Sequence, residues 1–370
     1  MAKIVYIADV CKEIFAGGDV PKDALSYEKT AEYNVPIFSN GEKNCGLYGY
    51  TNNARVKEPS ITVSARGTIG YTAIRTEPFV PVVRLITLTP KSEVIDLDYL
   101  FYATQNYKFE GSGTSIPQLT VPILKKYKFP LPEMSHQKTI AVKFEKLDQL
   151  ISLRKQQLAK LDELVKARFV EMFGDPVNNP MNYPKSQLGK VCDVRDGTHD
   201  SPEYYDVGYP LVTSKNVTGG KIDLSECNLI SEDDYKKICE RSKVDRGDII
   251  MPMIGTVGKP VIVNTEPMFA IKNVALIKFT PNSLVTNIYI KTLLESDYFD
   301  RAVLDKIRGG TQKFIALGDI RKLEIILPDL KHQQCFSAFV ERVEQQKQTV
   351  QQSLEKLELM KKALMQEYFG

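Results

Sequence analysis

The sequence lacks most of the residues from which enzymatic and metal centres are built. Its 370 residues include only three histidines, and its six cysteines form no CxxC pair, which argues against a zinc ribbon and against a disulfide framework. Neither a Gly-x-x-x-x-Gly-Lys-Ser/Thr phosphate loop nor a Gly-x-Gly-x-x-Gly dinucleotide fingerprint occurs. We therefore predict no catalytic residue, no metal site and no cofactor on this chain.

Charge of one sign and long hydrophobic runs are also missing. The 49 basic and 46 acidic residues leave a formal net charge of +3, which excludes a histone-like polycation. No run of 18 apolar residues occurs, so no membrane span is expected. The first residues do not have the order of a signal peptide, and a reducing, cytoplasmic location is the expectation.

What the sequence does contain is an internal repeat. Leu-Pro-Glu followed by His-Gln at 131–137 recurs 196 residues later as Leu-Pro-Asp followed by His-Gln at 327–333. Residues 156–174 and 352–370 are identical at 9 of 19 positions, and both end in Phe-Gly. Because the offset stays constant over two motifs, we interpret the chain as two copies of one plan.

Upstream loops repeat more loosely. The sequence Ser-Ala-Arg-Gly-Thr-Ile-Gly at 64–70 resembles Pro-Met-Ile-Gly-Thr-Val-Gly at 252–258, and Gly-Thr recurs at 113–114 and 310–311. The offsets drift in this part, as expected if insertions and deletions fall in surface loops. Each copy is predicted to be a globular unit followed by a long helix.

Both repeated helices carry a heptad pattern, in which apolar residues alternate four and three apart. The seams comprise Ile140, Phe144, Leu147, Ile151, Arg154, Leu158, Leu161, Val165, Arg168 and Met172, then Phe336, Val340, Val343, Lys347, Val350, Leu354, Leu357, Lys361, Leu364 and Tyr368. A helix of some 36 residues is about 54 Å long and must bury its seam, for which the other copy is the nearest partner. The helix pair is interpreted either as a brace or as a spacer between the units, and the two roles are compatible.

The globular units are predicted to have an α+β fold, because short apolar runs bounded by Gly, Asn and Pro do not alternate strictly with helices. The predicted strands include 61–64, 80–88, 249–253, 261–263 and 275–279, and the predicted helices include 97–107 and 287–308. The predicted domains are a globular unit at 1–135, a helix at 136–174, a second globular unit at 175–331 and a second helix at 332–370.

The duplicated order of Gly-Thr loop, Leu-Pro step and heptad helix resembles the specificity subunit of type I restriction–modification systems. The resemblance covers the whole chain. It implies two similar target recognition domains separated by two long antiparallel helices that form an intramolecular coiled coil with a pseudo-two-fold repeat. It also implies that each domain reads one half of an asymmetric bipartite site in double-stranded DNA, while the helices fix the gap.

The same resemblance implies partners. Two modification subunits, which methylate adenine with S-adenosylmethionine, are expected to dock on the helices. Whether two restriction subunits, which translocate and cut DNA, also join is left open by the sequence. The specificity subunit itself is expected to be non-catalytic, in agreement with the missing motifs.

Polar side chains in the loops are the candidates for DNA contact, since Lys and Thr can hold phosphates and Arg, Asn and Gln can pair with base edges. The candidates are Lys43, Asn44, Arg66, Thr68, Thr114 and Gln118 in the first unit, and Thr198, His199, Lys215, Asn216, Thr256, Arg308, Gln312 and Lys313 in the second. The other two histidines, His136 and His332, are expected to assist helix starts.

Two other functions remain open at this stage. A stand-alone nuclease or methyltransferase would need clustered carboxylates with a lysine, or a cofactor loop, and neither is found. A coiled-coil scaffold that joins other proteins without binding DNA would also fit the helices. It differs in predicting no salt-dependent DNA binding in the presence of a methyltransferase partner.

Overall fold

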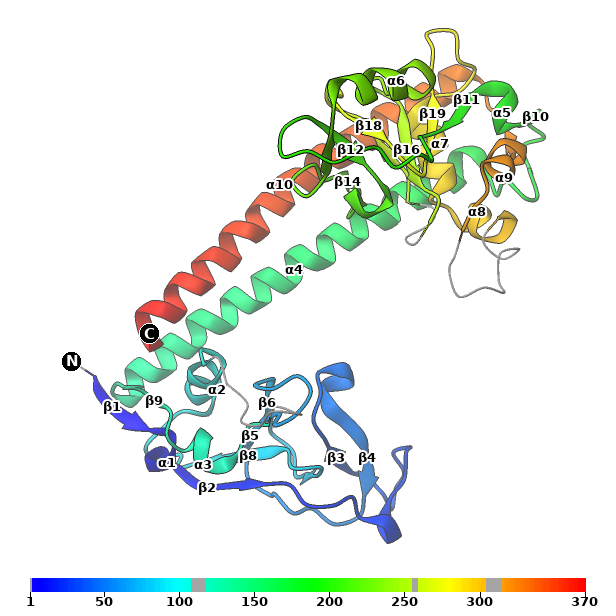
Figure 1. The fold of residues 1–370 in the computed structure, drawn as a ribbon. Helices are drawn as coiled ribbons and strands as arrows, with labels where there is room; N and C mark the ends of the chain where they lie inside the picture. The colour runs from blue at the N-terminus through cyan, green and yellow to red at the C-terminus, as the bar shows by residue number, and fades with distance from the viewer. Residues whose placement is uncertain (1, 108–117, 255–258, 304–313) are drawn as a thin grey trace. The chain divides into compact units, whose positions relative to one another are not determined.

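A computed structural model describes residues 2–107, 118–254, 259–303 and 314–370 of the chain (Figure 1). The chain divides into two compact units. The first comprises Met1–Gln156 together with Gln351–Gly370, and the second comprises Gln157–Val350. Each unit contains an α+β domain and a portion of both long helices.

The domain of the first unit is built on two small sheets. Their strand orders are β2-β8-β5-β6 and β4-β3-β7, and a separate antiparallel pair, β1-β9, joins the two ends of the domain. The strands are β1 (Lys3–Tyr6), β2 (Cys11–Ala16), β3 (Val35–Phe38), β4 (Leu47–Thr51), β5 (Ser60–Val63), β6 (Thr72–Arg75), β7 (Val80–Pro81), β8 (Ile86–Pro90) and β9 (Lys128–Leu131). The helices are α1 (Ile7–Val10), η1 (Lys22–Ala24), η2 (Lys43–Gly46), α2 (Leu97–Gln105) and α3 (Val121–Leu124).

The domain of the second unit repeats this connectivity. Its sheets have the orders β11-β19-β16-β17 and β15-β12-β18, and β10 pairs with β20 as β1 does with β9. The strands are β10 (Lys185–Gln187), β11 (Asp193–Asp196), β12 (Tyr209–Val212), β13 (Val217–Thr218), β14 (Lys221–Ile222), β15 (Asn228–Ile230), β16 (Ile249–Pro252), β17 (Val261–Ile262), β18 (Ala270–Ile271), β19 (Val274–Lys278) and β20 (Glu324–Ile326). The helices are α5 (Leu188–Val191), η3 (Ser214–Asn216), α6 (Glu232–Ser242), α7 (Asn287–Leu294), α8 (Asp297–Ala302) and α9 (Leu317–Lys322). The predicted duplication and the α+β class are confirmed.

One pair of glycines shows how closely the two domains correspond. Gly17 follows β2, and Gly197 follows β11 at the equivalent place. A Cβ atom on Gly17 would lie 2.5 Å from the carbonyl oxygen of Pro81, and one on Gly197 would lie 2.4 Å from that of Ile271. In each domain the two sheets therefore meet at a point where only glycine, which has no Cβ atom, fits.

The long helices α4 (Met134–Phe173) and α10 (Leu330–Phe369) pair antiparallel inside each unit. In the first unit Lys361 Nζ lies 2.6 Å from Asp148 Oδ1, and in the second Lys347 Nζ lies 2.7 Å from Asp162 Oδ1. Moving fourteen residues forward on α4 (162 − 148) thus moves the partner fourteen residues back on α10 (361 − 347). The predicted coiled coil is confirmed, and both predicted seam lysines meet a carboxylate of the other helix.

Apart from its two arginines and two lysines, the seam is apolar, as the heptads predict. The buried residues along it include Ile151, Leu161, Val343, Val350 and Leu354. Directly after α4, Gly174 has a φ of 74°, and its N–H donates to the carbonyl of Val170 at 2.8 Å. This left-handed residue after the last helical turn is the usual way a helix stops.

A buried glutamine fixes the start of each long helix. Gln137 Oε1 accepts from the backbone N–H of Asp96 at 2.8 Å, and its Nε2 donates to the carbonyl of Pro132 at 2.9 Å. Gln333 repeats both contacts, with the N–H of Thr286 at 2.9 Å and the carbonyl of Pro328 at 2.9 Å. Because the glutamine ties the long helix to the N-cap residue of α2 or α7, each domain has a defined attachment to its helix.

The histidines beside these glutamines lie on the surface. His136 and His332 are exposed, and His332 Nδ1 lies 2.8 Å from Oδ2 of Asp329, which also caps the backbone N–H of His332 at 3.0 Å. This contact agrees with the expected role of His332 at a helix start. In each repeated His-Gln pair, the histidine was the residue predicted to act at the helix start. The structure shows that the glutamine is the buried residue of the pair.

Two predicted elements are each interrupted. The strand expected over 80–88 is divided into β7 and β8 by a tight turn in which Val83 and Arg84 have φ values of 52° and 63°. The turn carries the chain from one sheet to the other, which the apolar pattern alone does not show. The helix expected over 287–308 is divided into α7 and α8 at Ser296, whose extended backbone starts the second helix. Residues 304–308 lie outside the described residues.

Candidate nucleic-acid interface

The predicted contacts Lys43 and Asn44 lie in a loop that is held against the end of β5. Asn40 Oδ1 accepts from the backbone N–H of Ala65 at 2.7 Å, and the N–H of Gly41 donates to Ser64 Oγ at 3.1 Å. Lys43 and Asn44 themselves are exposed. The loop therefore presents a cation and a carboxamide at the sheet end that also carries Arg66 and the repeated Gly-Thr sequence.

Arg66 and Gln118, predicted independently, form a pair. Arg66 donates from Nε and Nη2 to Gln118 Oε1 at 3.1 and 2.8 Å. The two backbones are joined next to this pair, because the N–H of Leu119 donates to the carbonyl of Ala65 at 2.9 Å. A carboxamide oxygen that receives two guanidinium N–H groups orients the arginine fork, which is the group best suited to guanine. Thr68 is exposed in the same loop, and Thr114 lies outside the described residues.

Thr198 and His199 lie at the end of β11 in the second domain. The Nδ1 atom of His199 is 2.8 Å from Asn273 Oδ1, and its Nε2 atom is 2.8 Å from Asp196 Oδ2. The guanidinium of Arg241 pairs with the other oxygen of Asp196. Both ring nitrogens of His199 face oxygen acceptors, an arrangement that only the doubly protonated imidazolium satisfies with two N–H donors.

Those contacts define a pH response. Hydrogen bonds from His199 to Asn273 and to Asp196 raise the pKa of the imidazole above its ordinary value of 6.5, although Arg241 opposes the shift. A raised folded-state pKa means that the interaction is fully present below pH 6.5 and is lost as the pH rises through the higher value. An NMR titration of the His199 ring should show this pKa, and in Asn273→Ala it should move back toward the ordinary value. An unshifted pKa in the parent chain would contradict the geometry.

Lys215 and Asn216 lie in a loop beside the histidine cluster, which is His199 with Asn273, Asp196 and Arg241. Ser214 Oγ donates to the carbonyl of Asn273 at 3.4 Å, which brings this loop to the same end of the sheet. Lys215 is exposed, whereas Asn216 is buried, and its Oδ1 accepts from the N–H and hydroxyl of Thr213 at 2.9 and 2.8 Å. The remaining predicted contacts of this domain, Thr256, Arg308, Gln312 and Lys313, lie outside the described residues.

Several residues of this surface were not predicted from the sequence. Asn273 and Arg241 hold the histidine cluster, and Lys272 donates to Ser201 Oγ at 2.6 Å. Ile254 and Phe314 form an isolated antiparallel bridge and are 36% and 49% exposed. Of these residues, only Ile254 could have been found from the sequence, because it aligns with Arg66 in the repeat. Residues such as Asn273 lie too far along the chain from His199 for spacing to reveal the contact.

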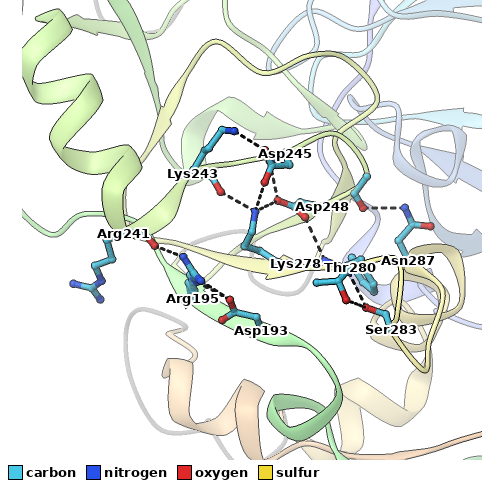
Figure 2. A network of polar contacts seen from close by, with 12 residues as sticks. Asp193, Arg195, Arg241, Lys243, Asp245, Asp248, Lys278, Thr280, Ser283 and Asn287 are labelled. Carbon is cyan, nitrogen blue, oxygen red and sulfur yellow. Dashed lines mark hydrogen bonds and ion pairs between the residues drawn. The ribbon is translucent and has the colours of Figure 1, made fainter.

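A polar network lies at the other end of β19 from Asn273 (Figure 2). Lys278 Nζ donates to Asp248 Oδ2 at 2.7 Å, to Asp245 Oδ2 at 2.8 Å and to the carbonyl of Lys243 at 2.9 Å. Burial lowers the pKa of Lys278, but the contacts with the two carboxylates outweigh it and the net pKa is raised. The network fixes the turn before β16 to β19.

Within the described residues, no group of three or more His, Cys, Asp or Glu side chains could hold a metal ion. The same part of the chain contains no helix with the length and hydrophobicity to cross a bilayer. What the described loops offer is hydrogen-bond donors, acceptors and cations at one end of each domain.

The chain thus combines a duplicated α+β domain, polar loops at a sheet end of each copy and a long helix after each copy. The family profile described as "Type I restriction modification DNA specificity domain" matches residues 2–163 and 180–359. Since the matches cover most of the chain, it belongs to the family of type I restriction–modification DNA specificity proteins.

Individual relatives agree. A putative type I specificity subunit of Mycoplasma pneumoniae is 36% identical over 172 residues, which is 44% of this chain and 47% of that protein. A second one from the same organism is 37% identical over 167 residues, or 42% of this chain and 49% of that protein. The alignments thus span about half the length of these two relatives. The specificity subunit of the MjaVIII type I restriction enzyme of Methanocaldococcus jannaschii is 25% identical over 304 residues, or 76% and 71% of the two chains.

Solved structures share the fold. The crystal structure of a type I restriction–modification S subunit from M. genitalium superposes with a TM-score of 0.64 at 15% identity, covering 100% of this chain and 96% of that one. A chain from a study of type I restriction–modification complex assembly gives a TM-score of 0.58 at 15% identity, covering 99% and 97%. At this identity the likeness establishes the fold.

Proposed function

We propose that this chain is the non-catalytic, sequence-specific DNA-binding subunit of a cytoplasmic type I restriction–modification complex. The observation that carries the proposal is the duplication of one domain with unlike polar loops at the same sheet end, in a chain of this family. Because the loops differ, the two domains would read different half-sites of an asymmetric bipartite target. The fourteen loop residues predicted from the sequence are the proposed contacts.

The chemistry of the described loops supports this proposal. Lys43 and Lys215 are exposed and suited to phosphate oxygens, whereas Arg66 and Asn44 carry groups that pair with base edges. Neither globular segment is basic overall: residues 1–135 carry 15 basic and 14 acidic groups, and residues 175–331 carry 21 and 22. The proposed surface is thus local, and its affinity would depend on the assembled complex.

The partners follow from the same proposal. Double-stranded DNA is the ligand, and two adenine-specific modification subunits would dock on α4 and α10 and supply the S-adenosylmethionine. Two restriction subunits are a further proposed addition. The paired helices would act as the ruler that sets the unread gap between half-sites.

Co-expression with an adenine methyltransferase from the same operon, followed by genome-wide mapping of methylated adenines, tests the function. We expect one asymmetric bipartite site with a fixed gap. Deleting residues 151–157 and 352–358 removes one heptad from each helix and keeps the observed antiparallel register. The helices shorten by about 10 Å, so the gap should shorten by about three base pairs of roughly 3.4 Å.

A length-matched control exchanges the same two heptads between the helices, which should leave the gap unchanged. A shorter helix pair with an unchanged gap would end the ruler proposal. An absence of methylation and of salt-dependent DNA binding in the assembled complex would end the DNA-recognition proposal and favour a scaffold that joins other proteins.

A further inference from the structure

The registers of the two domains place Ile254 where the first domain has Arg66. Ile61 of β5 pairs with Leu88 of β8, and Ile249 of β16 pairs with Ile277 of β19 at the equivalent point. Counting five residues on from Ile61 and from Ile249 reaches positions 66 and 254. Each of these residues follows the end of the corresponding central strand.

The partners of the two residues also correspond. The N–H of Leu119 donates to the carbonyl of Ala65 at 2.9 Å, and the N–H of Ile315 donates to the carbonyl of Met253 at 2.9 Å. This shared backbone bond makes Phe314 the equivalent of Gln118. The first domain therefore presents a hydrogen-bonded Arg–Gln pair where the second presents Ile and Phe.

Groups suited to DNA lie at the same end of the sheet as the apolar pair. Pro252, two residues before Ile254, pairs with Val274 of β19, which directly follows the Asn273 that binds His199. The exposed Lys215 lies in the loop that contacts Asn273. Exposed apolar residues at the same sheet end as an exposed lysine suit a duplex, whose phosphates need positive charge and whose base edges include one apolar group, the thymine 5-methyl.

We propose that the two domains read different chemistry at this one equivalent position: Arg66 with Gln118 hydrogen-bonds to base edges, and Ile254 with Phe314 makes apolar contact with a thymine methyl group. The inference rests on the proposed DNA-recognition function and deepens it. The apolar pair selects a base pair by the fit of its methyl group, and the polar pair selects one by hydrogen-bond pattern.

Replacing thymine by deoxyuridine removes only the methyl group, so it isolates this contact. The complex of the full chain with its methyltransferase is assayed on duplexes that carry the mapped site, with each thymine replaced in turn. One position in the half-site read by the second domain should lose about fourfold in affinity, the effect of one buried methyl group. The Phe314→Ala and Ile254→Ala complexes should bind the thymine and uracil duplexes equally.

One variant of the first domain and one conservative variant of the second serve as controls. Arg66→Ala should relax one position of the other half-site and leave the uracil response intact. Phe314→Leu, which keeps an apolar side chain, should retain part of the thymine preference. Because Ile254 and Phe314 are exposed, their alanine variants are expected to fold.

Three outcomes would overturn the inference. One is an equal affinity of the parent complex for thymine and uracil at every position. Another is an equal loss of affinity in Phe314→Ala on specific and unrelated DNA. The third is a loss of methyltransferase binding in Phe314→Ala. If the parent complex shows no salt-dependent binding to its mapped site, the proposed function itself fails, which separates the two failures.

Discussion

Replacing Lys278 with methionine is expected to lower the free energy of unfolding of the second unit by about 3–5 kcal/mol. Asp248 is only 2% exposed, and Lys278 is the one cation that hydrogen-bonds it among the described contacts. Removing the ammonium leaves a buried carboxylate without a counter-charge, which costs far more than an exposed pair. Hydrogen exchange of β16 and β19 in the full chain measures the loss directly.

The first domain supplies the matched control, because Ser60 and Thr89 occupy the positions equivalent to Asp248 and Lys278. Their hydroxyl oxygens lie 2.9 Å apart and are buried. The double variant Asp248→Ser with Lys278→Thr should therefore recover most of the lost stability. Lys12→Met, which breaks a pair whose side chains are 54% and 58% exposed, should cost less than about 1 kcal/mol. If Lys278→Met costs as little as Lys12→Met, the buried pair is not what holds the turn.

Replacing Phe369 with alanine is expected to destabilise the first unit by about 3–5 kcal/mol. The domain of that unit lies at the other end of the sequence from Phe369. Phe369 is 5% exposed, and its ring centroid lies 5.1 Å from that of Tyr99 and 5.8 Å from that of Phe144. The loss of the ring leaves a cavity beside α2. Faster hydrogen exchange in α2 is the expected signal.

The repeat again provides the control. Phe173, at the end of α4, is fully buried against Tyr289 and Phe336, with centroid distances of 5.1 and 5.4 Å. Phe173→Ala should therefore increase exchange in α7 of the second unit and leave α2 unchanged, the reverse of Phe369→Ala. Identical exchange profiles for the two variants would contradict the assignment of each terminal phenylalanine to its unit.

Sequence alone predicted the parts of the fold that depend on periodicity. The heptads predicted two long helices, α4 and α10 in the structure, because an apolar seam must be buried wherever it lies. Lys347 and Lys361 were predicted as seam residues from the same pattern. Their partners Asp162 and Asp148 lie beside the seam on the other helix, and only the observed register shows which carboxylate is in reach.

The sequence predicted which residue types in the loops could contact DNA. It did not predict which of those residues contact one another. Arg66 and Gln118 are 52 residues apart, and their contact depends on the backbone bond between Leu119 and Ala65. His199 drew attention as a rare residue, yet its position depends on Asn273 from a distant turn. Gln137 and Gln333 stood out in the repeat. Their role in attaching each long helix to its domain depends on burial, and the sequence does not show that a polar residue is buried.

The placement of Phe369 also has a consequence for how the protein is made. The second unit is one continuous stretch, Gln157–Val350, whereas the first requires Gln351–Gly370 to fill its core. A ribosome that adds about 5–20 residues per second needs roughly 10–40 s to proceed from residue 156 to residue 369. During that interval the core of the domain that is synthesised first lacks Phe369. The second unit can therefore complete its core before the first does, although it is synthesised later.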